Sequence, residues 1–392
     1  MPEAQPPTDR LSASQLFSYP FRIFFLSLAV QAVLIVPLWV GAITGRLDLP
    51  LALPALQWHQ HEMLFAWLSA AIAGFLLTAV CVWTGTERTR GWQLAGLWGV
   101  WLAGRLLITL GAPLPYALVA AVNLLFLPLV VLDAGLRIWR AGQRRQIVVL
   151  LVLAGLWLMQ LGFLAMPGAS FELGALIMAM TLMLVIGGRI TPNFSMGWLR
   201  GRGLPTEGIL ILPWLEWAVL AAMAVTFLSV LLAPPLVIAA TSAIAGALSL
   251  VRILLWRGWR IRHEPLLWIL HLSLLWIPAG LVLLSGSELG WWPATVWVHA
   301  IGLGAMGGLI LGVISRVALG HTGRTLTLPS GMTTAFILIH LGALIRVITG
   351  MGGLGWQLGV SASGALWTVA FAIYLYNYAG ILCRPRADGK PG

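Results

Sequence analysis

Charged residues are scarce in this chain of 392 residues. They make up 9% of it, whereas hydrophobic residues make up 60%. A soluble domain carries about 25% charged residues. The composition therefore excludes a soluble globular protein and indicates an integral membrane protein.

Cysteine is also scarce, with two residues in the whole chain. Cys81 lies inside an apolar run, and Cys383 lies at the start of the C-terminal tail. They provide neither a disulfide framework nor a CxxC or CxxCH pair, so covalent haem attachment is excluded. Residues 1–20 are polar and proline-rich and lack a signal-peptide pattern. We therefore expect a cytoplasmic N-terminal arm at residues 1–20.

Long apolar segments dominate the rest of the chain. Crossing a bilayer takes about 20 such residues, and we expect spans at 21–44, 58–83, 92–111, 114–136, 147–165, 171–190, 209–231, 234–255, 265–285, 293–315, 331–350 and 356–382. The sequence thus predicts an all-α polytopic membrane protein with about twelve transmembrane helices. A single transmembrane domain would occupy residues 21–382, followed by a disordered cytoplasmic tail at 383–392.

The net charge of +11 reflects topology rather than a nucleic-acid partner. With the N-terminus in the cytoplasm, nearly all loop arginines fall on the cytoplasmic side, and the opposite side receives Arg46 alone. Membrane proteins concentrate positive residues on the cytoplasmic side. Both termini are therefore predicted to be cytoplasmic, with the lipid bilayer as partner and the basic loops facing anionic head groups.

The second span begins with three ionisable residues, His59, His61 and Glu62. Such groups are costly at the edge of lipid and by default indicate a functional site. In the predicted topology they lie at the outer end of their span. Four further residues of other spans fall in the same outer half, namely His299, His340, Arg105 and Arg346.

A neutral imidazole is the usual ligand of transition metals and haem iron. Arginines on the same side could bind the carboxylates of haem. Residues two apart on a helix point about 200° apart, so His59 and His61 cannot both ligate one metal. Either one of them caps the helix in the interface, or each serves a different site. We favour His61 as the haem ligand because it is deeper in the span, with His59 second. The alternative for each histidine is a hydrogen bond between helices.

A second metal site has weaker support. His59 and Met63 share a helix face and could hold copper(I), although Met63 as an ordinary core residue is slightly favoured. His271, about one-third into the ninth span, and His340 are further candidate metal ligands. Glu62 could orient an imidazole, carry a proton or face the outer water.

Other polar and glycine-rich positions lie within the spans. Gly304, Gly308 and Gly312 form a stripe that favours helix packing over contact with a porphyrin. The glycines and Pro192 of the segment 187–194 predict that the sixth helix ends there. Glu216 and Asp133 could each belong to a proton path or pair with an arginine.

Four motifs together resemble the NnrS family of bacterial membrane proteins, and Tyr19–Arg22 also matches. They are Trp58–Phe65, Gly187–Phe194, Glu264–Trp268 with His271, and His299 with Gly320–Arg324. The resemblance covers nearly the whole chain. It implies a multi-pass inner-membrane protein that carries haem and copper and is associated with denitrification and resistance to nitrosative stress.

A fold-level analogy points the same way. Catalytic subunits of haem–copper oxidases also have twelve spans and place haem-ligating histidines on spans two and ten. Here spans six and seven contain no histidine, so the usual copper triad is missing.

Three functions follow from these observations. The leading one is a protein with one or two b-type haems, and copper as a further candidate cofactor, that binds nitric oxide or reduces it as an oxidoreductase with quinol as electron donor. The second is a transporter or a metal- or haem-trafficking protein that uses the His and Met residues as ligands. The third is a haem sensor.

Overall fold

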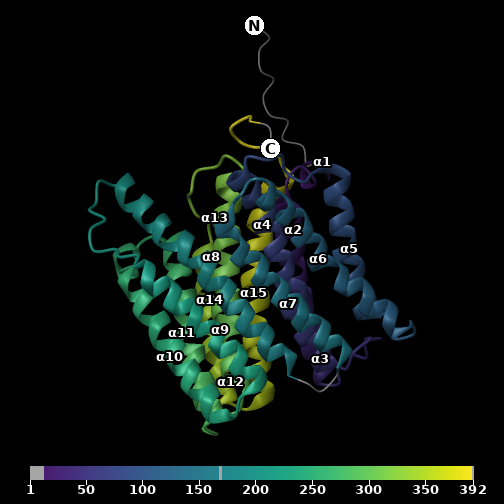
Figure 1. The fold of residues 1–392 in the computed structure, drawn as a ribbon. Coiled ribbons are helices and arrows are strands. Elements are labelled where there is room, and N and C mark those ends of the chain that lie inside the picture. The colour runs from purple at the N-terminus through teal and green to yellow at the C-terminus, as the bar shows by residue number, and fades with distance from the viewer. Residues whose placement is uncertain (1–12, 167–169, 391–392) are drawn as a thin grey trace. The chain divides into compact units, whose positions relative to one another are not determined.

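The computed structural model describes residues 13–166 and 170–390, and this part of the chain contains helices and no strands (Figure 1). Twelve of the described helical spans are long and apolar enough to cross a membrane. The predicted all-α polytopic fold is therefore confirmed. Of the expected N-terminal arm, residues 1–12 lie outside the described residues, and Ala13–Leu16 forms the short helix α1.

The chain divides into two compact units. One is formed by the residues up to Trp157, by Val313–Met332 and by the residues from Thr368 onward; the other is formed by Leu158–Gly312 and Thr333–Trp367. Four helices contribute residues to both units: α7 (Ile147–Ala165), α13 (Gly308–His321), α15 (Trp356–Cys383) and α14 (Met332–Gly350), the last through Met332 alone.

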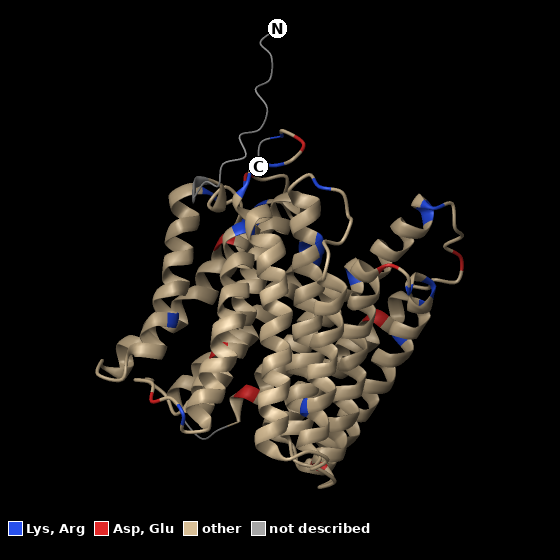
Figure 2. Cartoon of the chain, turned by 180° about the vertical axis from the view of Figure 1, so that it is seen from behind, with Lys and Arg blue, Asp and Glu red and all other residues tan. Residues whose placement is uncertain are grey.

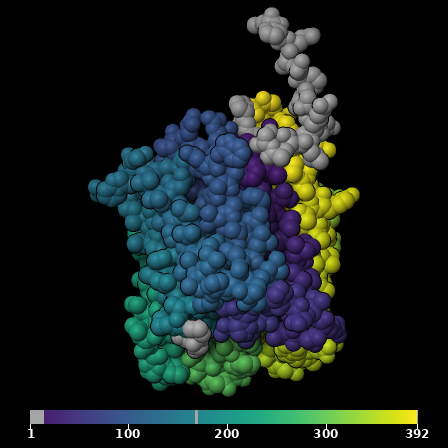
Figure 3. Space-filling model, turned by 90° about the vertical axis from the view of Figure 1, so that its right-hand side faces the viewer, coloured from purple at the N-terminus to yellow at the C-terminus, as the bar shows by residue number. Residues whose placement is uncertain are grey.

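The first unit contains the first four spans. Its further elements are α2 (Pro20–Ile43), α3 (Ala55–His61), η1 (Glu62–Trp67), α4 (Leu68–Thr84), α5 (Gly91–Leu110), α6 (Tyr116–Arg140) and η2 (Arg144–Gln146). Helix α4 packs against α2 and α6, and α5 packs against α6. Figure 3 shows α5 and α6 in blue beside the purple N-terminal segments. Gly74 permits the close approach of α4 to α2, because a Cβ there would lie 2.7 Å from the ring of Phe25.

The second unit contains the later spans. Its further elements are α8 (Phe171–Gly201), α9 (Pro213–Leu232), α10 (Pro235–Leu255), η3 (Gly258–Ile261), α11 (Pro265–Glu288), α12 (Thr295–His299), η4 (Ala300–Gly307) and α14 (Met332–Gly350). Helix α11 is central, since it packs against α8, α10, α12 and η4. Proline occupies the first turn of α9, α10 and α11, where its missing N–H would have no helical partner in any case.

Large apolar side chains cover the outer faces of the helices. Trp92 is 93% exposed and Leu232 is 82% exposed. Basic and acidic residues lie mostly in the connections and near helix ends (Figure 2). Exposing so much apolar surface to water would be unfavourable, at roughly 25 cal/mol per Å², whereas lipid accepts it. The protein is therefore a multi-pass membrane protein.

The sixth span is longer than expected. Helix α8 runs for 31 residues from Phe171 to Gly201 and contains Pro192, so the prediction that it ends near Pro192 is wrong. Pro192 and its neighbour Thr191 are buried. A proline inside a membrane helix is tolerated when neighbouring helices and hydroxyl side chains compensate for the lost hydrogen bond.

The C-terminal tail is ordered as far as Lys390, contrary to expectation. The guanidinium of Arg386 donates to the carbonyl oxygen of His321 (2.8 Å), and the backbone N–H of Ala387 donates to the carbonyl oxygen of Thr322 (2.9 Å). Arg386 also donates to Asp388, which holds the pKa of that carboxyl at about 2, well below its usual value. The bonds to His321 and Thr322 join residues 65 apart in sequence and follow no hydrophobic pattern, so the sequence did not indicate them.

Candidate functional site

The second span changes helix type at the predicted site. Helix α3 is an ordinary α-helix up to His61, the next six residues form the π-helix η1, and α4 completes the span. π-helices are rare and occur frequently at functional sites. Here the π-helix begins directly after His61.

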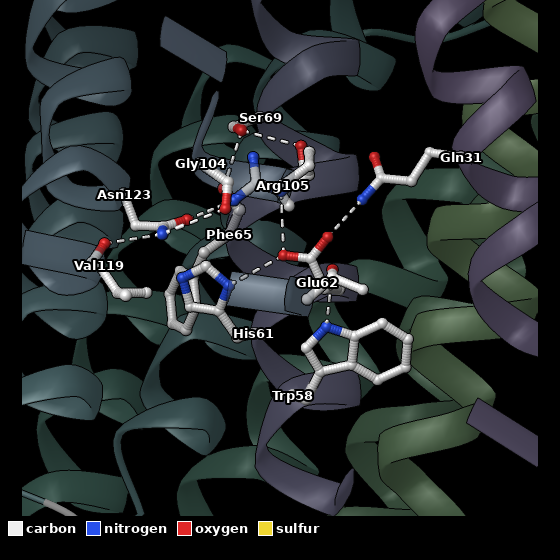
Figure 4. A network of polar contacts seen from close by, with 12 residues as sticks. Gln31, Trp58, His61, Glu62, Phe65, Ser69, Gly104, Arg105, Val119 and Asn123 are labelled. Atoms are coloured by element: carbon white, nitrogen blue, oxygen red, sulfur yellow. Dashed lines mark hydrogen bonds and ion pairs between the residues drawn. The ribbon is translucent and has the colours of Figure 1, made fainter. Parts of the chain in front are cut away.

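Glu62, the first residue of η1, is the centre of a buried polar network (Figure 4). Its Oε1 accepts from Nε of Arg105 at 2.9 Å, and its Oε2 accepts from Nε2 of Gln31 at 3.0 Å. Arg105 also donates to Oδ1 of Asn123 at 2.5 Å. Glu62 is 1% exposed and Arg105 is 11% exposed. A buried carboxylate is tolerated only when it is paired and hydrogen-bonded, and this network provides both.

The same carboxylate determines the tautomer of His61, that is, which ring nitrogen carries the hydrogen. Nδ1 of His61 lies 3.2 Å from Oε1 of Glu62, and the imidazole is fully buried. A carboxylate paired with Arg105 can only accept, so Nδ1 carries the hydrogen and Nε2 keeps its lone pair. Metal-ligating histidines typically donate their other ring N–H to a carboxylate or a carbonyl in this way.

His59 has different surroundings from His61. Its ring stacks on the indole of Trp39, with centroids 4.1 Å apart and an interplanar angle of 21°. The two histidines thus contact different partners, as their spacing predicts. Met63 lies in η1 and is half-buried.

The tenth span changes helix type in the same manner, in the part that belongs to the second unit. Helix α12 ends at His299, and the π-helix η4 follows directly. Nδ1 of His299 lies 2.7 Å from the carbonyl oxygen of Thr295. A carbonyl can only accept, so His299 too carries its hydrogen on Nδ1 and has its lone pair on Nε2.

Arg346 lies close enough to His299 to interact with it electrostatically. The two come together because α14 runs antiparallel to α12 and η4. A Cβ on Gly350 of α14 would contact Val296, and one on Gly308 would contact His340.

The side chain of Arg346 is only 6% exposed, yet none of the described residues gives it a hydrogen-bond acceptor or a carboxylate. A buried guanidinium without an anion costs several kcal/mol. The site is therefore suited to an anionic ligand.

His340 has the opposite tautomer. The indole N–H of Trp276 donates to its Nδ1 at 3.1 Å, so a neutral ring carries its hydrogen on Nε2. Nε2 is buried and has no acceptor among the described residues. A protonated Nε2 cannot donate a lone pair to a metal, so this geometry favours a packing or hydrogen-bonding role for His340.

His271 is held by a serine. Its Nε2 lies 2.9 Å from Oγ of Ser195, and this hydroxyl donates to the carbonyl of Thr191. Nε2 of His271 is therefore the donor, and the lone pair is on Nδ1. A Cβ on Gly258 would lie 2.6 Å from this Nδ1, which leaves no room for a metal ion on that side.

The glycine stripe of the tenth span is filled by side chains of α11. A Cβ on Gly304 would lie 2.5 Å from the indole of Trp276, and one on Gly312 would lie 2.8 Å from Ile269. The stripe therefore serves helix packing, which was the favoured interpretation, and a porphyrin does not lie along it.

The sequence left open whether Glu216 and Asp133 belong to a proton path or pair with an arginine. In the structure both pair with arginines. Glu216 of α9 accepts from Nε of Arg252 at 2.6 Å, and Asp133 accepts from Nη2 of Arg137 at 3.0 Å. Arg252 lies in the last turn of α10, within the predicted span 234–255, and is only 4% exposed. Its guanidinium occupies the space beside Gly188, which explains the glycine.

Three residues of these networks were not predicted: Gln31, Asn123 and Trp276. The signal available for Gln31 and Asn123 was a polar side chain inside an apolar span. Nothing in the sequence distinguishes Trp276 from the other tryptophans, because its role depends on the position of His340.

The predicted site residues are distributed over both units. His59, His61, Met63 and Arg105 lie in the first, and His271, His299, His340 and Arg346 lie in the second. A common site for His59 or His61 with His299 stays a prediction. Among the described residues, no three His, Cys, Asp or Glu side chains gather as a metal site.

Comparison with known families gives one result for this chain. The family described as NnrS protein matches residues 15–386. No curated protein matches the chain.

Proposed function

Because this chain belongs to the NnrS family, membrane proteins of the nitric oxide response, we propose that it binds b-type haem in the bacterial inner membrane and binds nitric oxide at the iron. The family match covers nearly the whole described chain, so the proposal concerns the complete membrane domain.

The pairing of His299 with Arg346 carries this proposal. His299 offers an Nε2 lone pair, and the neighbouring Arg346 is a buried cation that no described residue neutralises. Haem suits both groups, because its iron takes an imidazole nitrogen and its propionates pair with arginine.

His61 is the second proposed iron ligand. Glu62 fixes its tautomer and ring orientation, and Arg105 and Gln31 hold Glu62 in turn. A carboxylate that accepts from the other ring N–H of a ligating imidazole raises the basicity of that imidazole. Glu62 therefore acts as a positioning residue for His61.

A ferrous haem held by only one of these imidazoles would have an open coordination position and would supply the chemistry of nitric oxide binding. The bound gas could be held, or two molecules could be reduced with electrons from quinol. Nitric oxide consumption by the purified protein, measured with and without a quinol donor, distinguishes these two outcomes.

The optical spectrum of the purified protein, with a haem and metal count, tests the proposal. We expect a b-type haem spectrum, with haem content reduced at least tenfold, roughly the effect of losing a metal ligand or its support, in His299→Ala and His61→Ala. His340→Ala is the matched control within the membrane and keeps its haem, because Trp276 fixes the wrong tautomer for ligation. His263→Ala is the control in a loop.

A colourless, haem-free protein would contradict the proposal and leave the transporter or metal-trafficking alternative. The metal count also tests copper, which rests on the family and on the spacing of His59 and Met63. Arg346→Leu with unchanged haem content would show that this arginine does not hold the haem carboxylates.

A further inference from the structure

The end of α4 remote from His61 contains a polar cavity that the proposed haem site does not use. Its volume is about 250 Å³, and it lies among the ends of α4 and α13 and the connection to α5. Cys81 of this cavity follows His61 by 20 residues, which at 1.5 Å per residue is about 30 Å along the span. The cavity is therefore distinct from the site around Glu62.

Two of the sequence motifs build this cavity. Tyr19, from the motif Tyr19–Arg22, and His321, from the motif Gly320–Arg324, both line it. The rings of Phe21 and His321 are in contact, with centroids 5.5 Å apart, and the ordered tail binds the backbone of His321 through Arg386. Neither motif has a role in the haem proposal.

Arg88 is held at the cavity in a fixed position. Its Nε donates to the carbonyl oxygen of Ser18 (2.9 Å), its Nη1 donates to the hydroxyl of Tyr19 (2.7 Å), and its guanidinium lies 3.8 Å from the centre of the Tyr19 ring. Nη2 has no acceptor among the described residues. The hydroxyl of Tyr19 accepts from Arg88 and keeps its own hydrogen to donate. Both groups can therefore donate to an anion.

A second cation and the N-terminal end of a helix also favour the binding of an anion in this cavity. Arg90 also lines the cavity, is 59% exposed, and forms the N-cap of α5, a helix of 20 residues. The dipole of a helix attracts anions to its N-terminal end. The N–H of Gly91, the first residue of α5, already donates to the carbonyl oxygen of Phe17 (2.8 Å), so this end contributes through its dipole. Glu87, 3.7 Å from Arg90, is the one carboxylate lining this cavity, and it is 88% exposed. The cavity thus has a net positive charge.

One wall of the cavity is apolar and faces outward. Val82, on the last turn of α4, lines the cavity and is 75% exposed. Since the outer faces of these helices lie against lipid, the cavity combines a cationic interior with a rim at the membrane.

We propose that this cavity binds the phosphate group of an anionic membrane phospholipid through Arg88, Arg90 and the hydroxyl of Tyr19. The acyl chains would lie along the outer face of α4 at Val82. In the predicted topology this is the cytoplasmic leaflet, whose anionic lipids attract basic segments.

The test measures phospholipid binding to the delipidated, detergent-purified full chain by native mass spectrometry. We expect phosphatidylglycerol to bind about tenfold more tightly than phosphatidylcholine, whose choline cancels the phosphate charge. Arg88→Gln and Arg90→Gln should each weaken phosphatidylglycerol binding about tenfold, the effect of losing one charge-assisted hydrogen bond. Arg140→Gln, at the basic C-terminal end of α6, is the matched control and should bind normally.

Arg88 also holds the Ser18–Tyr19 segment, so its variant could lose binding through local disorder. Arg90→Gln has no such contacts, and its haem content should remain unchanged, which separates this inference from the haem proposal. Glycerol phosphate tests whether the bound phosphate group belongs to a lipid or to a soluble compound. If glycerol phosphate competes with phosphatidylglycerol as strongly as the lipid itself does, the site binds a soluble phosphate compound. Equal binding of the two lipids, or an equal loss in Arg140→Gln, would overturn the inference.

Discussion

At His61 and His299, Nδ1 lies against a group that can only accept a hydrogen bond, whereas at His340 it lies against the indole N–H of Trp276. The three imidazoles are chemically identical in the sequence. Their neighbours fix different tautomers, and the tautomer decides which nitrogen has a lone pair. Two of the three are thereby suited to ligate iron.

The contribution of Glu62 to the free energy of unfolding can be tested by substitution of this single residue. Glu62→Ala would leave the guanidinium of Arg105 buried without its anion, so we expect a loss of about 3–5 kcal/mol in the free energy of unfolding. Denaturant unfolding in detergent measures this loss. Asp133→Asn is the control, because the pair with Arg137 is partly exposed and should contribute less than about 1 kcal/mol. Similar losses in both variants would contradict the burial argument.

At the scale of elements, the two π-helices are the shared feature. Each begins directly after a histidine whose Nε2 has the lone pair, η1 after His61 and η4 after His299. A π-helix widens the turn and changes the direction in which side chains leave the helix. Sequence periodicity assumes 3.6 residues per turn, so it did not predict these segments.

The packing of η4 on α11 can be tested with a pair of glycines. Gly304→Ala places a Cβ against the indole of Trp276, whereas Gly302 has no atom within 4 Å of the corresponding position. We expect Gly304→Ala to reduce the free energy of unfolding by about 1–3 kcal/mol, because the core is already filled. Gly302→Ala should be neutral or stabilising by less than about 1 kcal/mol. Equal effects would show that the stripe does not set the helix contact.

For the whole molecule, the distribution of arginines predicts the topology. Basic residues resist transfer across the membrane, so loops rich in them stay in the cytoplasm. Both termini are therefore expected in the cytoplasm, and Arg46 on the opposite side. A resemblance of the helix arrangement to haem–copper oxidases stays a prediction.

Labelling with a membrane-impermeant maleimide tests this orientation. In a background with Cys81→Ser and Cys383→Ser, we expect Arg46→Cys to react in right-side-out vesicles and Arg140→Cys to react only in inverted ones. Both positions are exposed, so access to the reagent depends on the side of the membrane alone. The reverse pattern would invert the predicted topology.

The spans were predictable because lipid imposes a simple rule, a run of about 20 apolar residues. The expected segment 356–382 and the observed helix Trp356–Cys383 agree for this reason. The end predicted near Pro192 was wrong, because the rule for proline comes from isolated helices and ignores the neighbours that bury this turn. The pairing of Arg252 was not predicted for a related reason, since its partner Glu216 is 36 residues away in sequence.

By itself, the sequence determined the class of protein, the twelve spans and the positions at which ionisable groups enter the membrane. These follow from composition and from distance along one helix. Only the tertiary structure decided that Glu62 pairs with Arg105 and Gln31, that Trp276 rather than a carbonyl faces His340, and that Arg346 lies beside His299 without a protein anion. Hydrogen bonds form between groups brought together from distant parts of the chain, and each bond depends on where the partner's donor and acceptor atoms lie.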